Sequence, residues 1–311
     1  MSSIDLTVKL PGGRMLGYRV FGDPQGVPVI ALHGTPGSRL KFADSDEVAG
    51  RLGLKLISVD RWGYGLSSGA PRGRPTLADF GADMAELADH LGVSRCLITG
   101  VSGGGPFAIA AAVALGERAM GLALVSPIGV IDAATKLSTF HAVCFRVLPY
   151  WPRSITAMFH FYRSALRLAP DSAMRLALAL APAIDKRAID DDGIRRRLTA
   201  TFVSGFESGV SGVVTDLALF VRPWGIDLSA IAAPVRIWIG SADRNVPQDG
   251  VQRLAGALKG SELVTLHGAG HLWIASHGDV VMGWLAQLAH PKLEPDVRLK
   301  QPAPGGPSAK A

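Results

Sequence analysis

The chain shows two kinds of hydrophobic pattern. At its start, apolar residues occupy alternate positions on both sides of Pro11-Gly12-Gly13, which predicts an antiparallel, half-buried hairpin. Continuous apolar runs follow, and such runs are typical of strands that are covered on both faces. The runs are 27–32, 54–59, 96–99, 122–125, 235–239 and 263–266.

Helical patterns separate these apolar runs. They cover residues 77–91, 107–115 and 280–288, and Thr76 and Asp79 are spaced as a capping box for the first of them. Strands that alternate with helices predict an α/β fold, with a mostly parallel, doubly wound sheet and helices on both faces. The N-terminal hairpin is expected to add antiparallel strands at one edge.

Residues 127–226 break the alternation. They contain helical patterns interrupted by prolines, no convincing strand and a large share of the aromatic residues. We expect an inserted helical cap over a pocket, with 1–126 and 227–290 forming the core. The alternative is a helical bundle without a role in the site. Residues 291–311 are rich in proline and predict a flexible tail.

The composition limits the possible partners. The chain has 311 residues, 48% of them hydrophobic, and a formal net charge of +6. The basic residues are dispersed, and the densest group, 195–197, lies close after the acidic group 190–192. We therefore expect a small-molecule substrate and no nucleic acid. Nothing in the sequence decides between a monomer and a homodimer.

The cysteines and apolar segments indicate the compartment. Two cysteines, Cys96 and Cys144, cannot form a disulfide framework and show no metal-ligand spacing. The N-terminus has no apolar signal core, and no apolar run is long enough to cross a bilayer. We expect a cytoplasmic protein without membrane insertion.

Residues 100–104, Gly-Val-Ser-Gly-Gly, fit the pattern G-x-S-x-G. The apolar run 96–99 leads into them and a helical stretch from Pro106 leaves them, so Ser102 is expected at a tight strand-to-helix turn. There the backbone N–H of Gly103 could donate to an oxyanion. A phosphate-binding loop is the alternative, but it requires a Lys-Ser/Thr ending or G-x-G-x-x-G spacing, and both are missing here.

Together with two further motifs, this turn resembles the α/β-hydrolase family. Residues 33–37, His-Gly-Thr-Pro-Gly, look like the oxyanion loop of the family, and residues 60–67 are similar to its D-x-R-G-x-G-x-S turn. The resemblance covers residues 15–290. It implies an α/β-hydrolase fold, a nucleophile, acid and base in that chain order, and an oxyanion donor at the backbone of Thr35.

His271 is the expected base. It follows the apolar run 263–266 in Gly-Ala-Gly-His-Leu, where glycines permit a sharp loop back over the serine. His267 is expected to be structural, and His141 and His160 to lie on helices of the cap.

Asp243 is the expected acid, because it lies in the loop just past the apolar run 235–239 and could accept from the imidazole Nδ1–H. A merely turn-forming role remains the alternative. Asp132 is the second candidate for the acid, since the family sometimes draws it from the preceding strand. Asp227 and Asp249 are poorer candidates.

Four more residues have expected roles. His33 is interpreted as a structural anchor, and Asp60 and Arg61 as residues that brace a turn. Trp273 could bind substrate in the pocket or merely pack.

These residues favour a serine hydrolase that cleaves a carboxylic ester or a similar acyl bond of a small apolar substrate through an acyl-enzyme at Ser102. The expected chemistry needs no metal and no cofactor. The alternatives are cofactor-free haloperoxidase-like or carbon–carbon bond hydrolase chemistry, or a ligand-binding receptor or scaffold. Aspartate-nucleophile enzymes are disfavoured by Ser102, and proline iminopeptidases carry glycine where this chain has Thr35.

Overall fold

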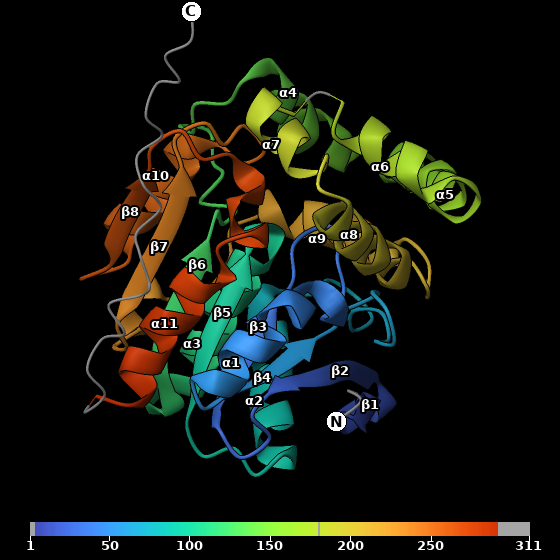
Figure 1. Ribbon diagram of the computed structural model, residues 1–311. Coiled ribbons are helices and arrows are strands. Elements are labelled where there is room, and N and C mark those ends of the chain that lie inside the picture. The colour runs from blue at the N-terminus through green and yellow to red at the C-terminus, as the bar shows by residue number, and fades with distance from the viewer. Residues whose placement is uncertain (1–3, 180, 292–311) are drawn as a thin grey trace, which may run out of the picture.

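The structure is a computed structural model, and it describes residues 4–179 and 181–291. Its centre is one sheet with the strand order β1-β2-β4-β3-β5-β6-β7-β8 (Figure 1). The strands are β1 (Asp5–Lys9), β2 (Met15–Gly22), β3 (Val27–Leu32), β4 (Leu54–Val59), β5 (Cys96–Val101), β6 (Ala119–Val125), β7 (Val235–Gly240) and β8 (Glu262–Leu266). Strand β2 pairs antiparallel with β1 and β4, and all other pairs are parallel. The predicted mostly parallel sheet with an antiparallel edge hairpin is confirmed.

Helices cover both faces of this sheet, as predicted. One apolar cluster joins the sheet to α2 (Leu77–His90), α3 (Gly105–Leu115) and α10 (Gln248–Ala257). The other cluster joins it to α1 (Asp46–Arg51) and α11 (Gly278–Ala289). The doubly wound arrangement follows from the apolar strands, because each strand needs cover on both faces.

Helix α2 shows how local sequence sets an element. Thr76 accepts from the backbone of Asp79, and the Asp79 carboxylate accepts from the backbone of Thr76, so the predicted capping box is present. The two groups satisfy N–H donors that lack partners inside the helix. The buried positions of α2, among them Phe80 and Met84, then face the sheet.

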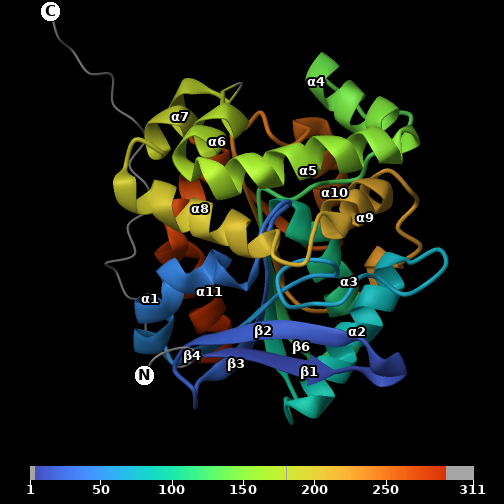
Figure 2. The same ribbon diagram turned by 90° about the vertical axis from the view of Figure 1, so that its right-hand side faces the viewer.

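Between β6 and β7 the chain forms only helical elements within the described residues of 127–226, and we call this segment the helical insertion. Its helices are α4 (Thr139–Ala142), α5 (Pro152–Leu168), α6 (Pro170–Ala177), α7 (Ala183–Ala188), α8 (Asp192–Gly205) and α9 (Ser211–Phe220). They lie over the edge of the sheet at which the parallel strands end (Figures 1 and 2). Of the predicted tail, residues 292–311 lie outside the described residues.

No helix in the described part of the chain is both long enough and apolar enough for a transmembrane span.

Replacing Phe107 by alanine is expected to lower the free energy of unfolding by about 3–5 kcal/mol, because the ring is 1% exposed and leaves a cavity in the core. Its neighbours include Phe80, with ring centroids 4.9 Å apart. Urea denaturation measures the change. The matched control is Phe161→Ala, whose ring is 72% exposed and whose loss should change stability by no more than about 0.5 kcal/mol. Equal losses in the two variants would contradict the assignment of the core.

Candidate active site

Ser102 lies in a strained turn between β5 and α3. It begins a 3-10 turn, η3 (Ser102–Gly104), with a φ of 53°, in the left-handed region that residues other than glycine rarely adopt. The turn packs tightly against the end of β3. A Cβ atom on Gly104 would lie 2.5 Å from the carbonyl oxygens of Leu32 and His33, so glycine is required there. This packing holds the serine at the carboxyl edge of the sheet.

Two other strand ends bring their side chains to this serine. A short loop follows β8, and His271 begins the 3-10 turn after this loop. The His271 Nε2 lies 3.1 Å from the Ser102 Oγ. Asp243 follows β7, and its Oδ2 lies 2.8 Å from the His271 Nδ1. The three residues that the sequence singled out therefore form one hydrogen-bonded chain, although 169 positions separate the serine from the histidine.

The carboxylate of Asp243 is buried, with an exposed fraction of 3%. Its Oδ1 accepts from the backbone N–H of Asn245 at 2.8 Å and of Val246 at 3.3 Å. Burial raises its pKa, but the charge and hydrogen bond of His271 and the Asn245 N–H more than offset this, so the pKa is lowered. An ionised carboxylate at this place keeps the imidazole proton on Nδ1 and leaves Nε2 free to accept.

The pKa of His271 results from opposed influences. Burial lowers it, while the charge and hydrogen bond of Asp243 raise it. The negative charge of Asp185 raises it further, and the positive charge of Lys41 lowers it. The pKa of His271 is raised overall, because the carboxylates stabilise the imidazolium.

Asp185 comes from α7 of the helical insertion and was not singled out by the sequence. It is 1% exposed, and its Oδ1 accepts from the backbone N–H of Leu272 at 2.8 Å. A Cβ atom on Gly270 would lie 2.3 Å from this same oxygen, so the carboxylate is pressed against the loop that carries His271. Within the described residues its Oδ2 has no hydrogen-bond partner. An insertion residue thus supports the loop of the histidine.

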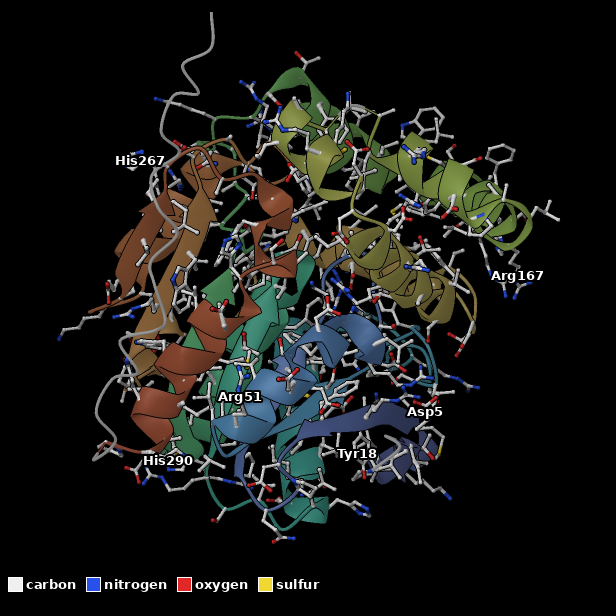
Figure 3. All side chains as sticks on the ribbon, viewed as in Figure 1. Asp5, Tyr18, Arg51, Arg167, His267 and His290 are labelled. Carbon is white, nitrogen blue, oxygen red and sulfur yellow. The ribbon has the colours of Figure 1, made fainter. Side chains whose placement is uncertain are left out.

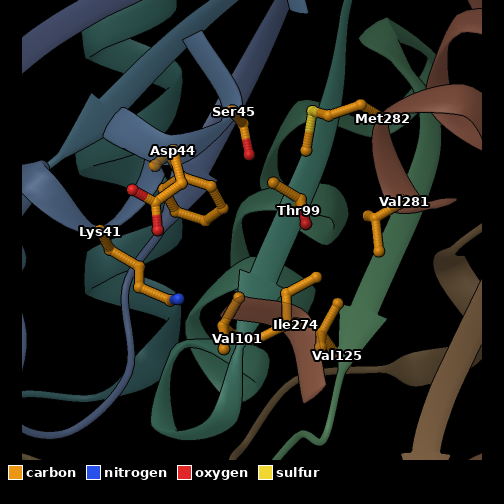
Figure 4. A pocket seen from close by; sticks show the side chains of 10 residues that line it. Lys41, Asp44, Ser45, Thr99, Val101, Val125, Ile274, Val281 and Met282 are labelled. Atoms are coloured by element: carbon orange, nitrogen blue, oxygen red, sulfur yellow. The ribbon is translucent and has the colours of Figure 1, made fainter. Parts of the chain in front are cut away.

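Lys41 lies in the 3-10 segment η2 (Arg39–Ser45), which follows the loop after β3. It lines a cavity of about 10 Å³ together with Val101 and Ile274, and its amine extends toward Val101 (Figure 4). Burial lowers the pKa of this amine, and Asp44 opposes the effect. The positive charge of this amine is the one that lowers the pKa of His271.

The loop 33–37 packs against the serine turn. A Cβ atom on Gly34 would lie 3.2 Å from the Ser102 Cβ, and one on Gly103 would lie 2.1 Å from the Thr35 Oγ1. Thr35 and Gly103, the two expected oxyanion donors, are therefore neighbours beside Ser102. Within the described residues the backbone N–H of Thr35 donates to no protein acceptor.

His33 is fully buried below this loop and has both ring nitrogens occupied. Its Nε2 accepts from the backbone N–H of Arg61 at 3.1 Å, so its Nδ1 donates to the Gly34 carbonyl at 2.8 Å. Burial, together with the charge of Arg61, holds its pKa well below the ordinary value. A neutral histidine with these partners holds the loop in place, as the anchor interpretation describes.

Arg61 and Asp216 form a buried ion pair that joins this loop to α9. Their side chains are 0% and 2% exposed, and the Arg61 Nη1 lies 2.6 Å from the Asp216 Oδ1. The second carboxylate oxygen accepts from the Thr35 hydroxyl at 2.5 Å and the Tyr64 hydroxyl at 2.6 Å. One sequence signal could have found Asp216: it is the single charged residue of α9, a helix that is otherwise mostly apolar.

Asp60 also braces its turn, as expected. Its buried carboxylate accepts from the backbone N–H groups of Arg39 at 2.6 Å and Leu66 at 2.9 Å, and from the Arg39 guanidinium at 2.9 Å.

The remaining candidates lie elsewhere. Asp132, the second candidate for the acid, forms an exposed ion pair with Arg253 and caps its own turn. His267 is exposed at the surface beyond β8 (Figure 3). His141 is buried on α4. Trp273 is 7% exposed and belongs to the apolar cluster between the sheet and α11.

Within residues 4–179 and 181–291, no group of three His, Cys, Asp or Glu side chains is arranged to hold a metal ion.

The fold and this site together define a class of protein. The family model of the α/β hydrolase fold matches residues 27–277, a stretch that includes Ser102, Asp243 and His271. The chain belongs to the α/β-hydrolase fold family, as the sequence motifs predicted.

Similar proteins within this family have several activities. A proline iminopeptidase of Neisseria meningitidis serogroup A is 34% identical over 113 residues, which cover 33% of each chain. A haloalkane dehalogenase 2 of Mycobacterium tuberculosis is 33% identical over 104 residues, covering 32% of this chain and 34% of the enzyme. The chain thus matches about a third of the length of these relatives. A thermophilic esterase from Thermogutta terrifontis shares the fold with a TM-score of 0.66 and 22% identity, covering 93% of this chain and 100% of the esterase.

Replacing Asp216 by asparagine is expected to lower the free energy of unfolding by about 3–5 kcal/mol, because it leaves the Arg61 guanidinium buried without a counter-charge. Chemical denaturation at neutral pH measures the loss. The matched control is Asp190→Asn in the same insertion, whose side chain is 68% exposed; its effect should stay within about 0.5 kcal/mol. A wild-type stability of the Asp216 variant would show that the pair does not hold the insertion to the core.

Proposed function

We propose that this protein is a serine hydrolase that cleaves a carboxylic ester, or a similar acyl bond, of a small apolar substrate. The observation that carries the proposal is the hydrogen-bonded chain from Asp243 through His271 to Ser102, at distances of 2.8 and 3.1 Å. The left-handed φ of Ser102 adds support, because such strain persists where the surrounding structure enforces it and is frequent at functional sites.

In the proposed acylation step, the Ser102 oxygen attacks the carbonyl carbon of the ester while the His271 Nε2 takes the hydroxyl proton. The carbonyl π electrons move onto oxygen and form an oxyanion. When the tetrahedral intermediate collapses, the bond to the alcohol oxygen breaks and His271 returns the proton to that oxygen. Asp243 stabilises the imidazolium that forms between these transfers.

The developing oxyanion is proposed to accept hydrogen bonds from the backbone N–H groups of Thr35 and Gly103. The contact between these two residues beside Ser102 supports this assignment, as does the N–H of Thr35, which has no protein acceptor within the described residues. Fixed donors of this kind are usually the largest single contribution to such catalysis.

In the proposed deacylation step, His271 takes a proton from water, and the resulting hydroxide attacks the acyl carbon. The intermediate then collapses, the Ser102 oxygen leaves, and the imidazolium returns the proton to it. The products are a carboxylic acid and the regenerated serine. This mechanism draws on side chains and backbone groups of the chain itself and on no metal or cofactor.

The helical insertion is proposed to act as the cap of this site, since α7 and α9 already contribute Asp185 and Asp216 to the loops around it. Trp273 remains a prediction as a substrate contact. The geometry gives no separate support to haloperoxidase-like chemistry, to carbon–carbon bond hydrolysis or to a receptor function.

Replacing Ser102 by alanine is expected to abolish labelling by a fluorophosphonate probe and to lower hydrolysis of p-nitrophenyl esters by roughly ten-thousand-fold or more. Ser154→Ala, on the exposed side of α5, is the control and should react like the wild type. A panel of esters of increasing acyl length then defines the substrate preference. Undiminished labelling of the Ser102 variant would remove this serine as the nucleophile.

Replacing Asp185 by asparagine is expected to move the acid limb of the pH–rate profile to lower pH. Only neutral His271 can accept the serine proton, so activity falls as pH drops through its pKa. Asp185 stabilises the charged imidazolium and thereby raises this pKa, and its removal lowers the pKa. The measurement is kcat/KM for a p-nitrophenyl ester against pH.

Two controls accompany this experiment. Lys41→Met removes a charge that lowers the pKa of His271, so its acid limb should move to higher pH. Asp190→Asn, an exposed carboxylate on the same insertion, should leave the limb in place. Shifts in the same direction for the Asp185 and Lys41 variants would contradict an electrostatic origin.

A further inference from the structure

The helical insertion leaves an unusual amount of apolar surface uncovered. Most of the large apolar side chains that are exposed in the described part of the chain lie between residues 140 and 168. They are Phe140, Val143, Val147, Tyr150, Trp151, Met158, Phe161 and Leu168. Four of them are exposed over most of their surface: Tyr150 is 81% exposed, Trp151 65%, Phe161 72% and Leu168 86%. We call these eight exposed side chains, on α4, on α5 and on the segment between them, the α4–α5 face. Exposed apolar groups concentrated in this way mark interaction surfaces.

On α5 the exposed apolar residues follow helical spacing. Trp151, just before the helix, and Met158, Phe161 and Leu168 within it are 7, 3 and 7 positions apart, which places them on one side. Ile155 and Leu166, each 2% exposed, occupy the neighbouring side and face the protein interior. The apolar side of α5 is therefore wider than the strip of the helix that packs against the rest of the protein.

The same segment carries positive charge only. No Asp or Glu lies between Asp132 and Asp171, whereas this stretch contains Lys136, Arg146, Arg153, Arg163 and Arg167. The described residues provide no ion pair to any of these five cations.

Where these cations do have protein partners, the partners are uncharged. Arg146 and Arg163 donate to main-chain carbonyl groups, so their charges are not neutralised. Arg167 projects away from the body of the protein at the end of α5 (Figure 3).

We propose that the α4–α5 face docks on an anionic membrane surface. Aromatic and aliphatic side chains on one side of a helix, with arginines beside them, are the pattern of helices that lie in the plane of a lipid interface. Tyr150 and Trp151 suit this position, because their rings are apolar and their polar atoms can remain at the headgroup level. Binding of this kind is peripheral and requires no helix that spans the bilayer, and it adds a lipid surface to the small-molecule substrate that the sequence predicts as a partner.

The unpaired cations decide between a membrane and a second copy of the chain. Two copies joined through this face would bring like charges together, which is unfavourable at an interface. Anionic headgroups would instead neutralise these cations while the acyl region takes up the apolar side chains. The inference does not depend on the chemistry of Ser102.

The first test is co-sedimentation of the full chain with unilamellar vesicles. Vesicles that contain phosphatidylcholine and phosphatidylglycerol in equal parts should bind the protein, and vesicles of phosphatidylcholine alone should bind it much more weakly. Added salt should weaken the binding to the anionic vesicles, because it screens the arginine charges. Equal binding to both kinds of vesicle, or binding to neither, would overturn the proposal.

Paired variants test the surface itself. The double change Arg153→Gln and Arg167→Gln should weaken partitioning to the anionic vesicles by roughly 30-fold, whereas Arg51→Gln on α1 should not. The double change Phe161→Ser and Leu168→Ser should weaken it as well, whereas Leu6→Ser, 39% exposed on β1, should not. Unchanged thermal unfolding would show that all variants are folded.

Light scattering without vesicles measures the oligomeric state and tests whether a second copy of the chain covers the α4–α5 face. A monomer, or a dimer that persists in the Phe161 and Leu168 variant, is expected. A dimer that dissociates in this variant, together with no vesicle binding by the wild type, would show that a second copy covers the face.

Discussion

At the boundary between the sheet and the helical insertion, an arginine and an aspartate are buried together. Removing two charges from water costs several kcal/mol for each ion, so such a pair is tolerated only when nearly every donor and acceptor has a partner. Arg61 meets this condition through Asp216, the carbonyls of His33 and Gly34 and the Thr35 hydroxyl. Its guanidinium also lies 4.4 Å from the centroid of the Phe107 ring, in the core cluster. The loop beside Ser102 is therefore held from the core and from α9 at once.

This arrangement limits how the insertion can move. If α9 left the core, the Arg61 charge would stay buried without its partner, a state that is strongly unfavourable. Any opening that admits a substrate while preserving this pair must therefore come from the helices that precede α9. Asp185 on α7 belongs to those helices, and it both accepts from Leu272 and acts on His271. A displacement of α7 would change the electrostatic environment of the histidine, so access to the site and the basicity of His271 would be coupled.

Local sequence was sufficient to predict the sheet and the three side chains that form the hydrogen-bonded chain, and both predictions have the same physical reason. Each of Ser102, Asp243 and His271 follows an apolar strand within a few residues, and the carboxyl ends of parallel strands share one edge of the sheet. The residues that support them gave weaker signals. Asp185 contacts a partner 87 positions away, and Asp216 contacts Arg61 across 155 positions. In its own helix, Asp185 has the pattern of an ordinary surface acid beside Lys186 and Arg187. Only the packing of the insertion on the core reveals its role.

The two sides of the insertion differ in the side chains that they present, and the packing of the insertion on the core does not require this difference. Toward the core it contributes Asp185 and Asp216, both nearly fully buried and bonded to the loops around Ser102. Toward solvent it shows the apolar α4–α5 face, and the segment that forms this face carries positive charge only. Exposed aromatic and aliphatic side chains gain nothing for the isolated fold, and they carry a risk of aggregation. A partner that takes up apolar groups and neutralises arginines would remove this cost. One insertion would then carry both an external binding surface, on α4 and α5, and the contact to the loop of His271, on α7.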